Sequence, residues 1–218
     1  TSEKYAPMVK EQLPMILEDN ILKEPCRRNT APCIAYAAWK IKKRFPNANM
    51  VVTRSDHFVA DVPEFRRVIK SSLAFVADSD AILTLGIKPT RPETGFGYIE
   101  AVLGSSSLVN KEVFRVDSFK EKPALEIAKA YIAKNNFYWN SGIFIWNVST
   151  IVNAFRIYQS PIASVFESLI PYYYTAEEQE KVNERFPDCR SISVDYAIME
   201  RAEEIFVFPA NFGWSDLG

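Results

Sequence analysis

Ala81-Ile82-Leu83-Thr84-Leu85-Gly86-Ile87 is a continuous apolar run of strand length, typical of a strand that is buried on both faces of a sheet. Upstream of it, one helix is predicted by apolar residues at helical spacing, namely Val62, Phe65, Val68, Ile69, Leu73 and Val76. Before that helix, Met50-Val51-Val52-Thr53 predicts another buried strand. The order strand, helix, strand indicates a parallel sheet that is covered by helices on both sides.

The alternation of strands and helices continues toward the N-terminus, and the pattern changes after Ile87. Toward the N-terminus we expect a helix from Ala31 to about Arg44, a short strand at residues 20–25 and a helix at residues 1–13. Downstream, strands at residues 98–103 and 113–119 follow each other without a helix between them. Helices then dominate, at about residues 124–134, 149–158, 161–170, 175–185 and 194–202, with strands near 143–146 and 205–208. We interpret residues 1–218 as one α/β domain with a mixed, mainly parallel sheet.

Composition and charge exclude several classes of protein. With 48% hydrophobic and 24% charged residues, the chain of 218 residues is ordinary globular material. Its net charge of −1 gives no electrostatic footprint for nucleic acid or an anionic membrane. Three cysteines and one histidine suit neither a disulfide framework nor a zinc site, and no apolar run approaches the roughly 20 residues needed to cross a bilayer. We therefore expect a cytoplasmic protein without nucleic-acid or membrane partners.

Two aspartates follow predicted strands at opposite ends of the chain. Asp56 comes after Met50–Thr53, and Asp216 comes after the apolar run Ile205-Phe206-Val207-Phe208. Ligands of open α/β sheets bind beyond the carboxyl ends of the strands, and Mg²⁺ is held there by one or two carboxylates plus substrate phosphates. Either aspartate alone is as well explained as a cap or turn residue. Together they predict a Mg²⁺ site made by Asp56 and Asp216.

Three other segments carry polar groups between these aspartates. Lys122, between Glu121 and Pro123, is expected in extended geometry at a strand-to-helix junction, where its charge could meet a phosphate. Asn140 offers an amide suited to a pair of sugar hydroxyls. Gly97 lies in a Gly-Phe-Gly turn that indicates a close approach of the backbone to another group. A solvated charge pair and plain turn residues remain the simpler explanations for each of these taken alone.

A fourth segment, Arg28-Asn29-Thr30-Ala31-Pro32, stands at the start of the predicted helix that ends near Arg44. Asn29 or Thr30 can cap that helix, and Pro32 suits its first turn. Arg28, however, works against the helix dipole, which favours a role in binding an anion or a base edge.

These segments, taken in order, resemble the bacterial mannose-1-phosphate guanylyltransferases, a family of sugar-1-phosphate nucleotidyltransferases. The resemblance rests on Glu24-Pro25 with Arg28–Pro32, Ser55-Asp56-His57, Ile87–Gly95, Phe119–Pro123, Trp139–Phe144, Ser193–Glu200 and Gly213–Gly218. It covers essentially the whole chain. It implies a Rossmann-like nucleotidyltransferase fold and the reaction of GTP with α-mannose 1-phosphate to give GDP-mannose and pyrophosphate.

The same resemblance implies a role for each matching residue. Asp56 and Asp216 would hold a Mg²⁺ ion, and Lys122 would bind the sugar phosphate. Glu121, Asn140 and the backbone of Gly97 would contact the sugar. Arg28, Asn29 and Thr30 would lie near guanine.

The chain departs from the family pattern in ways that bear on activity. It has no counterpart of the Gly-rich loop G-G-x-G-x-R-L-x-P, and Arg54 stands where the family usually has Pro, two residues from Asp56. Because the chain starts at Thr1 and stops at Gly218 inside a motif, we expect a partial domain that is incomplete at both ends and inactive alone. Arg54 is expected to distort its loop or to draw Asp56 into an ion pair.

Two other interpretations remain open at this point. One is a transferase for another nucleotide or sugar phosphate, and the other is a non-catalytic regulatory subunit that binds sugar nucleotides. The sequence also leaves open whether the full-length protein is a homo-oligomer.

Overall fold

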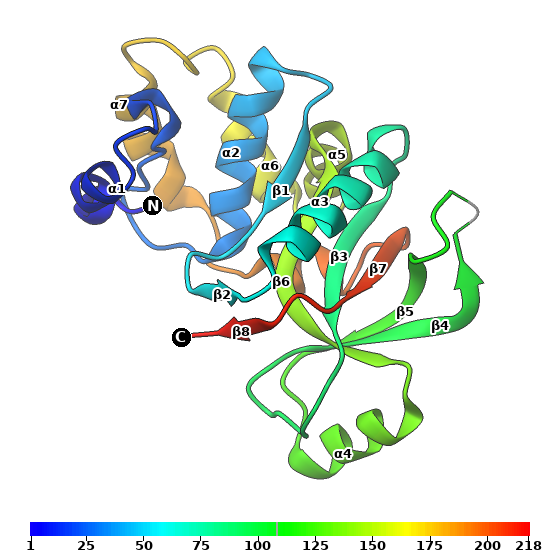
Figure 1. Ribbon diagram of the computed structural model, residues 1–218. Coiled ribbons are helices and arrows are strands. Elements are labelled where there is room, and N and C mark those ends of the chain that lie inside the picture. The colour runs from blue at the N-terminus through cyan, green and yellow to red at the C-terminus, as the bar shows by residue number, and fades with distance from the viewer. Residues whose placement is uncertain (108) are drawn as a thin grey trace. The chain divides into compact units, whose positions relative to one another are not determined.

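The computed structural model describes residues 1–107 and 109–218, which form two compact units (Figure 1). The first unit comprises Thr1–Ala48 and Ile151–Ala202, and the second comprises Asn49–Thr150 and Glu203–Gly218. The chain therefore leaves the first unit after Ala48, returns to it within the helix α5 (Val148–Tyr158) and leaves it again after Ala202.

The first unit is helical. Its longest helix is α2 (Thr30–Arg44), which packs against α6 (Ser160–Ser168) through an aromatic cluster of Tyr36, Trp39, Phe155 and Phe166. Its remaining helical segments are η1 (Glu3–Tyr5), α1 (Ala6–Gln12), η2 (Glu18–Asn20), α7 (Glu178–Arg185), η3 (Phe186–Asp188) and the π-helical turn η4 (Asp195–Met199).

The strand that we predicted at residues 20–25 was wrong. Residues Glu18–Asn20 form a turn of 3-10 helix, and the only ladder contact of this segment is an isolated parallel bridge between Ser2 and Glu24 within the described residues. An apolar stretch of this length becomes a strand only where another strand is available to pair with it, and none lies beside it in the described part of the first unit.

The second unit contains a sheet of six strands in the described part of the chain, in the order β1-β6-β3-β7-β5-β4. The strands are β1 (Asn49–Val52), β3 (Ile82–Ile87), β4 (Tyr98–Ser106), β5 (Phe114–Lys120), β6 (Phe137–Asn147) and β7 (Ile205–Ala210). Strand β6 also pairs with β4, with Phe137–Trp139 opposite Tyr98–Glu100 in antiparallel register. As predicted, every residue of β3 is buried.

The mixed α/β class is confirmed, but the prediction of a mainly parallel sheet is wrong. Among the described pairings within this six-stranded sheet, only β3 with β7 is parallel. Strands β1 and β3 do run in the same direction, joined by the predicted helix α3 (Val62–Ala77), but β6 lies between them and is antiparallel to both. The sequence showed only the apolar end of β6, so its insertion at this place could not be predicted.

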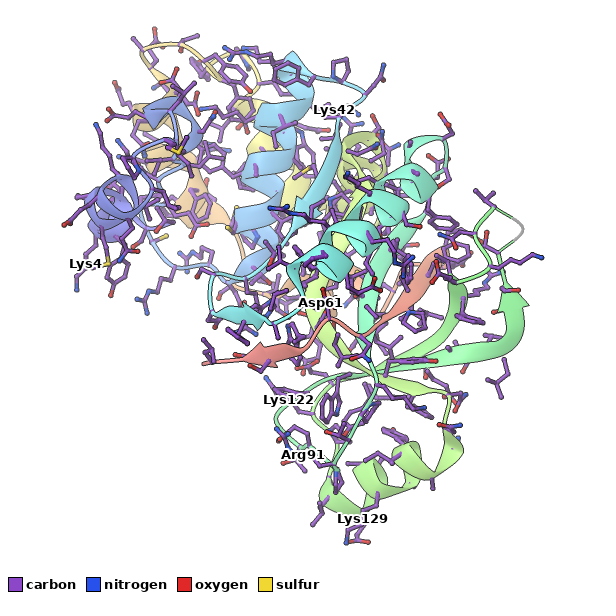
Figure 2. The ribbon with its side chains drawn as sticks, in the orientation of Figure 1. Lys4, Lys42, Asp61, Arg91, Lys122 and Lys129 are labelled. Carbon is purple, nitrogen blue, oxygen red and sulfur yellow. The ribbon has the colours of Figure 1, made fainter. Side chains whose placement is uncertain are left out.

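Helices flank this sheet. Helix α3 packs on β1, β3, β6 and β7, and its Val68 and Val76 lie in a core with Leu83, Leu85 and Phe208. The side chain of Asp61 caps α3 by accepting a hydrogen bond from the Glu64 amide at 2.9 Å, at the point labelled in Figure 2. Helix α4 (Leu125–Lys134) packs against β6.

A second, two-stranded pairing completes this unit. Strand β2 (His57–Val59) pairs with β8 (Trp214–Asp216) in antiparallel register. Neither strand was predicted, because three residues are too few to show a period of two. In the described residues, no helix has the length and apolar character that a membrane span requires.

Candidate active site

The pairing of β2 with β8 brings the two predicted metal ligands together. His57 lies opposite Asp216 in this ladder, and the Leu217 amide donates to the Asp56 carbonyl at 2.9 Å. A Cβ built on Gly218 would lie 2.9 Å from Asp56 Oδ2 and 3.1 Å from Asp216 Oδ1, so carboxylate oxygens of both residues surround one point. Residues 160 positions apart in the sequence therefore present their charges at one place.

Arg54 binds both carboxylates. Its Nη2 donates to Asp56 Oδ2 at 3.0 Å, and its Nη1 lies 3.4 Å from Asp216 Oδ2. The expected ion pair with Asp56 is thus present, and the second one with Asp216 was not foreseen. The Asp216 side chain is 14% exposed and that of Asp56 is 36% exposed, whereas Arg54 is 53% exposed.

His57 adds a titratable ring beside this pair. Its imidazole packs edge-on against Trp214, with ring centroids 5.3 Å apart, and both ring nitrogens are buried without a hydrogen-bond partner among the described residues. Burial lowers the pKa of His57, and the Arg54 charge lowers it further, while Asp56 and Asp216 oppose the shift. The sequence placed His57 next to Asp56 but gave it no role.

A second group of predicted residues meets around Gly97. The Gly97 carbonyl accepts a hydrogen bond from the backbone amide of Asn140 at 2.8 Å. A Cβ at Gly97 would lie only 2.5 Å from Glu121 Oε2. Asn140 Oδ1 in turn accepts from the Gly142 amide at 3.0 Å. Residues from β6, from the end of β5 and from the turn before β4 are thereby in contact, and a side chain at position 97 would displace the Glu121 carboxylate.

The two groups are continuous with each other. Phe96 packs edge-on against both Trp139 and Trp214, each with ring centroids 5.4 Å apart. Gly142, at a positive φ of 69°, leaves room for the stem of Arg54, because a Cβ there would lie 3.3 Å from Arg54 Cδ. Phe96, Trp139 and Trp214 were not predicted as residues of the candidate site. In each of the three motifs, however, an aromatic residue stands close to a glycine, and this pattern could have indicated them.

Lys122 lies beside this region at the molecular surface (Figure 2). Its ammonium is 3.4 Å from Glu121 Oε1, and its side chain is 64% exposed. The prediction of extended geometry was wrong, because Lys122 has a φ of 46° in the left-handed region. The turn from β5 toward α4 overrides the preference that Pro123 imposes on the residue before it.

The predicted guanine contacts, Arg28, Asn29 and Thr30, belong to the first unit and have partners there. Arg28 Nη2 donates to the Pro187 carbonyl at 2.7 Å, and Thr30 Oγ1 accepts from the Val194 amide at 2.9 Å. Asn29 caps α2, with its Oδ1 accepting from the Thr30 amide at 2.8 Å. These contacts confirm the capping role, while the base-binding role stays a prediction.

The carboxylate pair fits a hard divalent cation. Asp56 Oδ1 is buried and accepts no hydrogen bond from the described residues, although Arg54 pairs with the other oxygen of this carboxylate. The described part of the chain holds no group of three or more His, Cys, Asp or Glu side chains suited to a metal. A metal here would therefore have two protein carboxylates, the number typical of Mg²⁺ that also contacts phosphates.

Comparison with known proteins connects this geometry to an enzyme family. A family model described as nucleotidyl transferase matches residues 1–218. An Escherichia coli protein named mannose-1-phosphate guanylyltransferase is 37% identical over 224 residues, which is 100% of this chain and 48% of that protein. A Salmonella typhimurium protein named mannose-1-phosphate guanylyltransferase ManC is 36% identical over 225 residues, 100% of this chain and 46% of its own length.

A solved structure agrees with this comparison. The crystal structure of a Thermus thermophilus protein named mannose-1-phosphate geranyltransferase superposes with a TM-score of 0.82 at 25% identity, covering 100% of this chain and 59% of that one. The chain spans about half the length of the curated relatives that it matches.

Proposed function

This chain belongs to the nucleotidyl transferase family, and we propose that its full-length form transfers a guanylyl group from GTP to α-mannose 1-phosphate, yielding GDP-mannose and pyrophosphate. The relatives named mannose-1-phosphate guanylyltransferase support these two substrates over another nucleotide or another sugar phosphate. In such a transfer, an oxygen of the sugar phosphate attacks the α-phosphorus of GTP. The bond from the α-phosphorus to the β-phosphate bridge breaks, and pyrophosphate leaves.

One observation carries the proposal. The carboxylate pair of Asp56 and Asp216 and the cluster of Gly97, Glu121 and Asn140 are continuous through Asn140–Gly142 of β6 and the Phe96 ring. Phosphoryl-group chemistry needs little from the protein beyond positioning and charge compensation. A continuous site would supply both if its carboxylates held a cation that offsets the phosphate charge and its other end positioned the sugar.

Each residue then has a task. Glu121 would accept hydrogen bonds from sugar hydroxyls, and the Asn140 amide would both donate and accept. Lys122 would meet the sugar phosphate with its exposed ammonium. Asp56 and Asp216 would hold Mg²⁺, which when bound would offset the negative charge of the phosphates. Arg28, Asn29 and Thr30 are proposed to lie near guanine.

The sugar end can be tested by binding, independently of turnover. Tryptophan fluorescence should report the binding of mannose 1-phosphate, because Trp139 and Trp214 lie in the proposed site. We expect G97A to weaken binding at least about tenfold, since its Cβ would meet Glu121 Oε2 at 2.5 Å and displace a sugar-binding carboxylate. G95A is the matched control, because its nearest neighbour, Glu93 Oε1, is 3.4 Å away and no backbone strain opposes alanine there.

The phosphate end has its own test. K122M should weaken binding of mannose 1-phosphate while leaving the much weaker binding of mannose unchanged, because only the charge is removed. K129M, on a lysine of α4 that is 53% exposed, should change neither. Failure of the unaltered full-length protein to bind mannose 1-phosphate would contradict the proposed substrate. Preference for another sugar phosphate would support the alternative of a different nucleotidyltransferase.

A further inference from the structure

Arg54 bridges the two carboxylates of the candidate metal site. Its guanidinium contacts Asp56 Oδ2 at 3.0 Å and Asp216 Oδ2 at 3.4 Å, using one terminal nitrogen for each. We infer that Arg54 is a built-in cation that closes the Asp56–Asp216 pair in the absence of metal and has to move away before a divalent cation can bind. This inference rests on the proposed role of the two aspartates as metal ligands.

Charge explains why the arginine settles there. Two carboxylates that surround one point repel each other, and a planar guanidinium can neutralise both at once because its donors are arranged as a fork. A bound Mg²⁺ needs its oxygen ligands about 2.1 Å away, and it would repel a guanidinium held on the same oxygens. The cation and the arginine are therefore alternatives at this place.

The structure also gives the arginine a path away from the pair. Its side chain is 53% exposed, so solvent lies beside it and can receive the charged end once its two ion pairs break. Its stem lies against Gly142, where a Cβ would come within 3.3 Å of Arg54 Cδ and 4.0 Å of Arg54 Cγ. Glycine at position 142 thus leaves the stem room beside β6, and the charged end is the part that moves.

The direct test measures affinity for Mn²⁺, added alone as a probe to the metal-free chain of 218 residues. Free Mn²⁺ is followed by electron paramagnetic resonance in the unaltered chain and in R54M. We expect R54M to bind Mn²⁺ roughly three- to tenfold more tightly, because exposed ion pairs of this kind are individually weak. R54K should fall between the two, since lysine meets one carboxylate at a time.

The chain offers a matched control in Arg67. This arginine also bridges two carboxylates, Glu64 at 2.8 Å and Glu112 at 3.0 Å, and its side chain is 48% exposed. R67M removes the same charge and the same kind of bridge within the same unit, so it should leave the Mn²⁺ affinity unchanged. Thermal unfolding of each variant, followed by circular dichroism, establishes that the fold is retained.

The possible outcomes distinguish the proposed metal site from the role inferred for Arg54. D216N should abolish Mn²⁺ binding in the R54M background, which would support the metal site. If the unaltered chain binds Mn²⁺ and R54M binds it equally or less tightly, Arg54 is not the competing cation, although the metal site stands. If neither the unaltered chain nor R54M binds Mn²⁺, the metal role of the aspartates fails and this inference fails with it. Tighter binding by R67M would show a general effect of charge and overturn the specific role of Arg54.

Discussion

At the scale of single residues, His57 is the group whose behaviour in solution the structure defines most sharply. It is the one histidine of the chain, its ring nitrogens are buried, and Arg54 adds a nearby positive charge. Burial and this charge lower its pKa from the ordinary value of 6.5. The folded protein therefore favours the neutral ring.

The first prediction follows from that shift. Nitrogen NMR of the imidazole should give a pKa below 6.5 in the metal-free protein, and R54M should raise it by removing one of the causes. Because the unfolded chain takes up this proton more readily, the free energy of unfolding should decrease as the pH falls through about 6.5. H57Q should lack this part of the pH dependence. A pKa above 6.5 would contradict the packing described for the ring.

The sequence could select candidate site residues, but it could not predict their contacts. Asp56, Asp216, Glu121, Asn140 and Gly97 could be selected because each stands in a motif next to a predicted strand or turn. The bridge from Arg54 to Asp216 depends on a strand pairing between residues far apart in the chain. Such a pairing leaves no local pattern, so only the contact with neighbouring Asp56 could be anticipated.

At the scale of elements, the short ladder of β2 with β8 decides where the carboxylates lie. The chain enters strand β8 through Gly213, which has a φ of 64° and lies against Ala60. A Cβ at position 213 would be 2.6 Å from Ala60 Cβ. The Ala60 amide donates to the Gly213 carbonyl at 3.2 Å, and the Asp61 amide donates to the Phe212 carbonyl at 3.0 Å. The glycine is therefore needed both for its conformation and for its lack of a side chain.

G213A should accordingly lower the free energy of unfolding by about 2 kcal/mol or more, from a left-handed alanine and from overlap with Ala60. G104A separates these causes, because Gly104 has a similar φ of 78° but nothing within 4 Å of its Cβ position. Urea unfolding measures both variants. Equal losses in the two would mean that backbone conformation alone accounts for the cost, and that the contact with Ala60 yields without strain.

Elements with long apolar patterns were predicted well, as α2, α3 and β3 illustrate. Elements that depend on partners were not. The strand β6 extends over 11 residues, but its first half alternates buried and half-buried positions around Asn140 and Gly142, and the sequence predicted a strand only near residues 143–146. The mixed direction of the sheet follows from where this strand inserts, which is a property of tertiary packing.

At the scale of the whole molecule, the first of the two compact units contains a buried ion pair of its own. Lys40 and Glu178 form an ion pair at 2.7 Å with side chains that are 10% and 11% exposed. Glu178 also accepts from the Tyr36 hydroxyl at 2.9 Å and from the Tyr174 amide at 2.7 Å. These contacts tie α2 to α7, and removal of the lysine would leave a buried carboxylate without its cation.

K40M is therefore predicted to destabilise the first unit by about 3–5 kcal/mol, while K129M, which breaks an exposed pair, should cost less than about 1 kcal/mol. Amide hydrogen exchange should show the loss of protection in Thr1–Ala48 and Ile151–Ala202, with the strands of the second unit still protected. Loss of protection throughout both units at once would show that they unfold as one.

The continuity of β7 with β8 has a practical consequence for protein engineering. Asp216 is reached from β7, a strand paired on both sides in the sheet, through the fully buried Phe212. Asp56, in contrast, lies between β1 and the three-residue strand β2, on a segment that is mostly exposed. Libraries designed to test the proposed metal site should therefore diversify residues 53–56 and leave 205–214 untouched, because variation in the latter would destabilise the core along with Asp216.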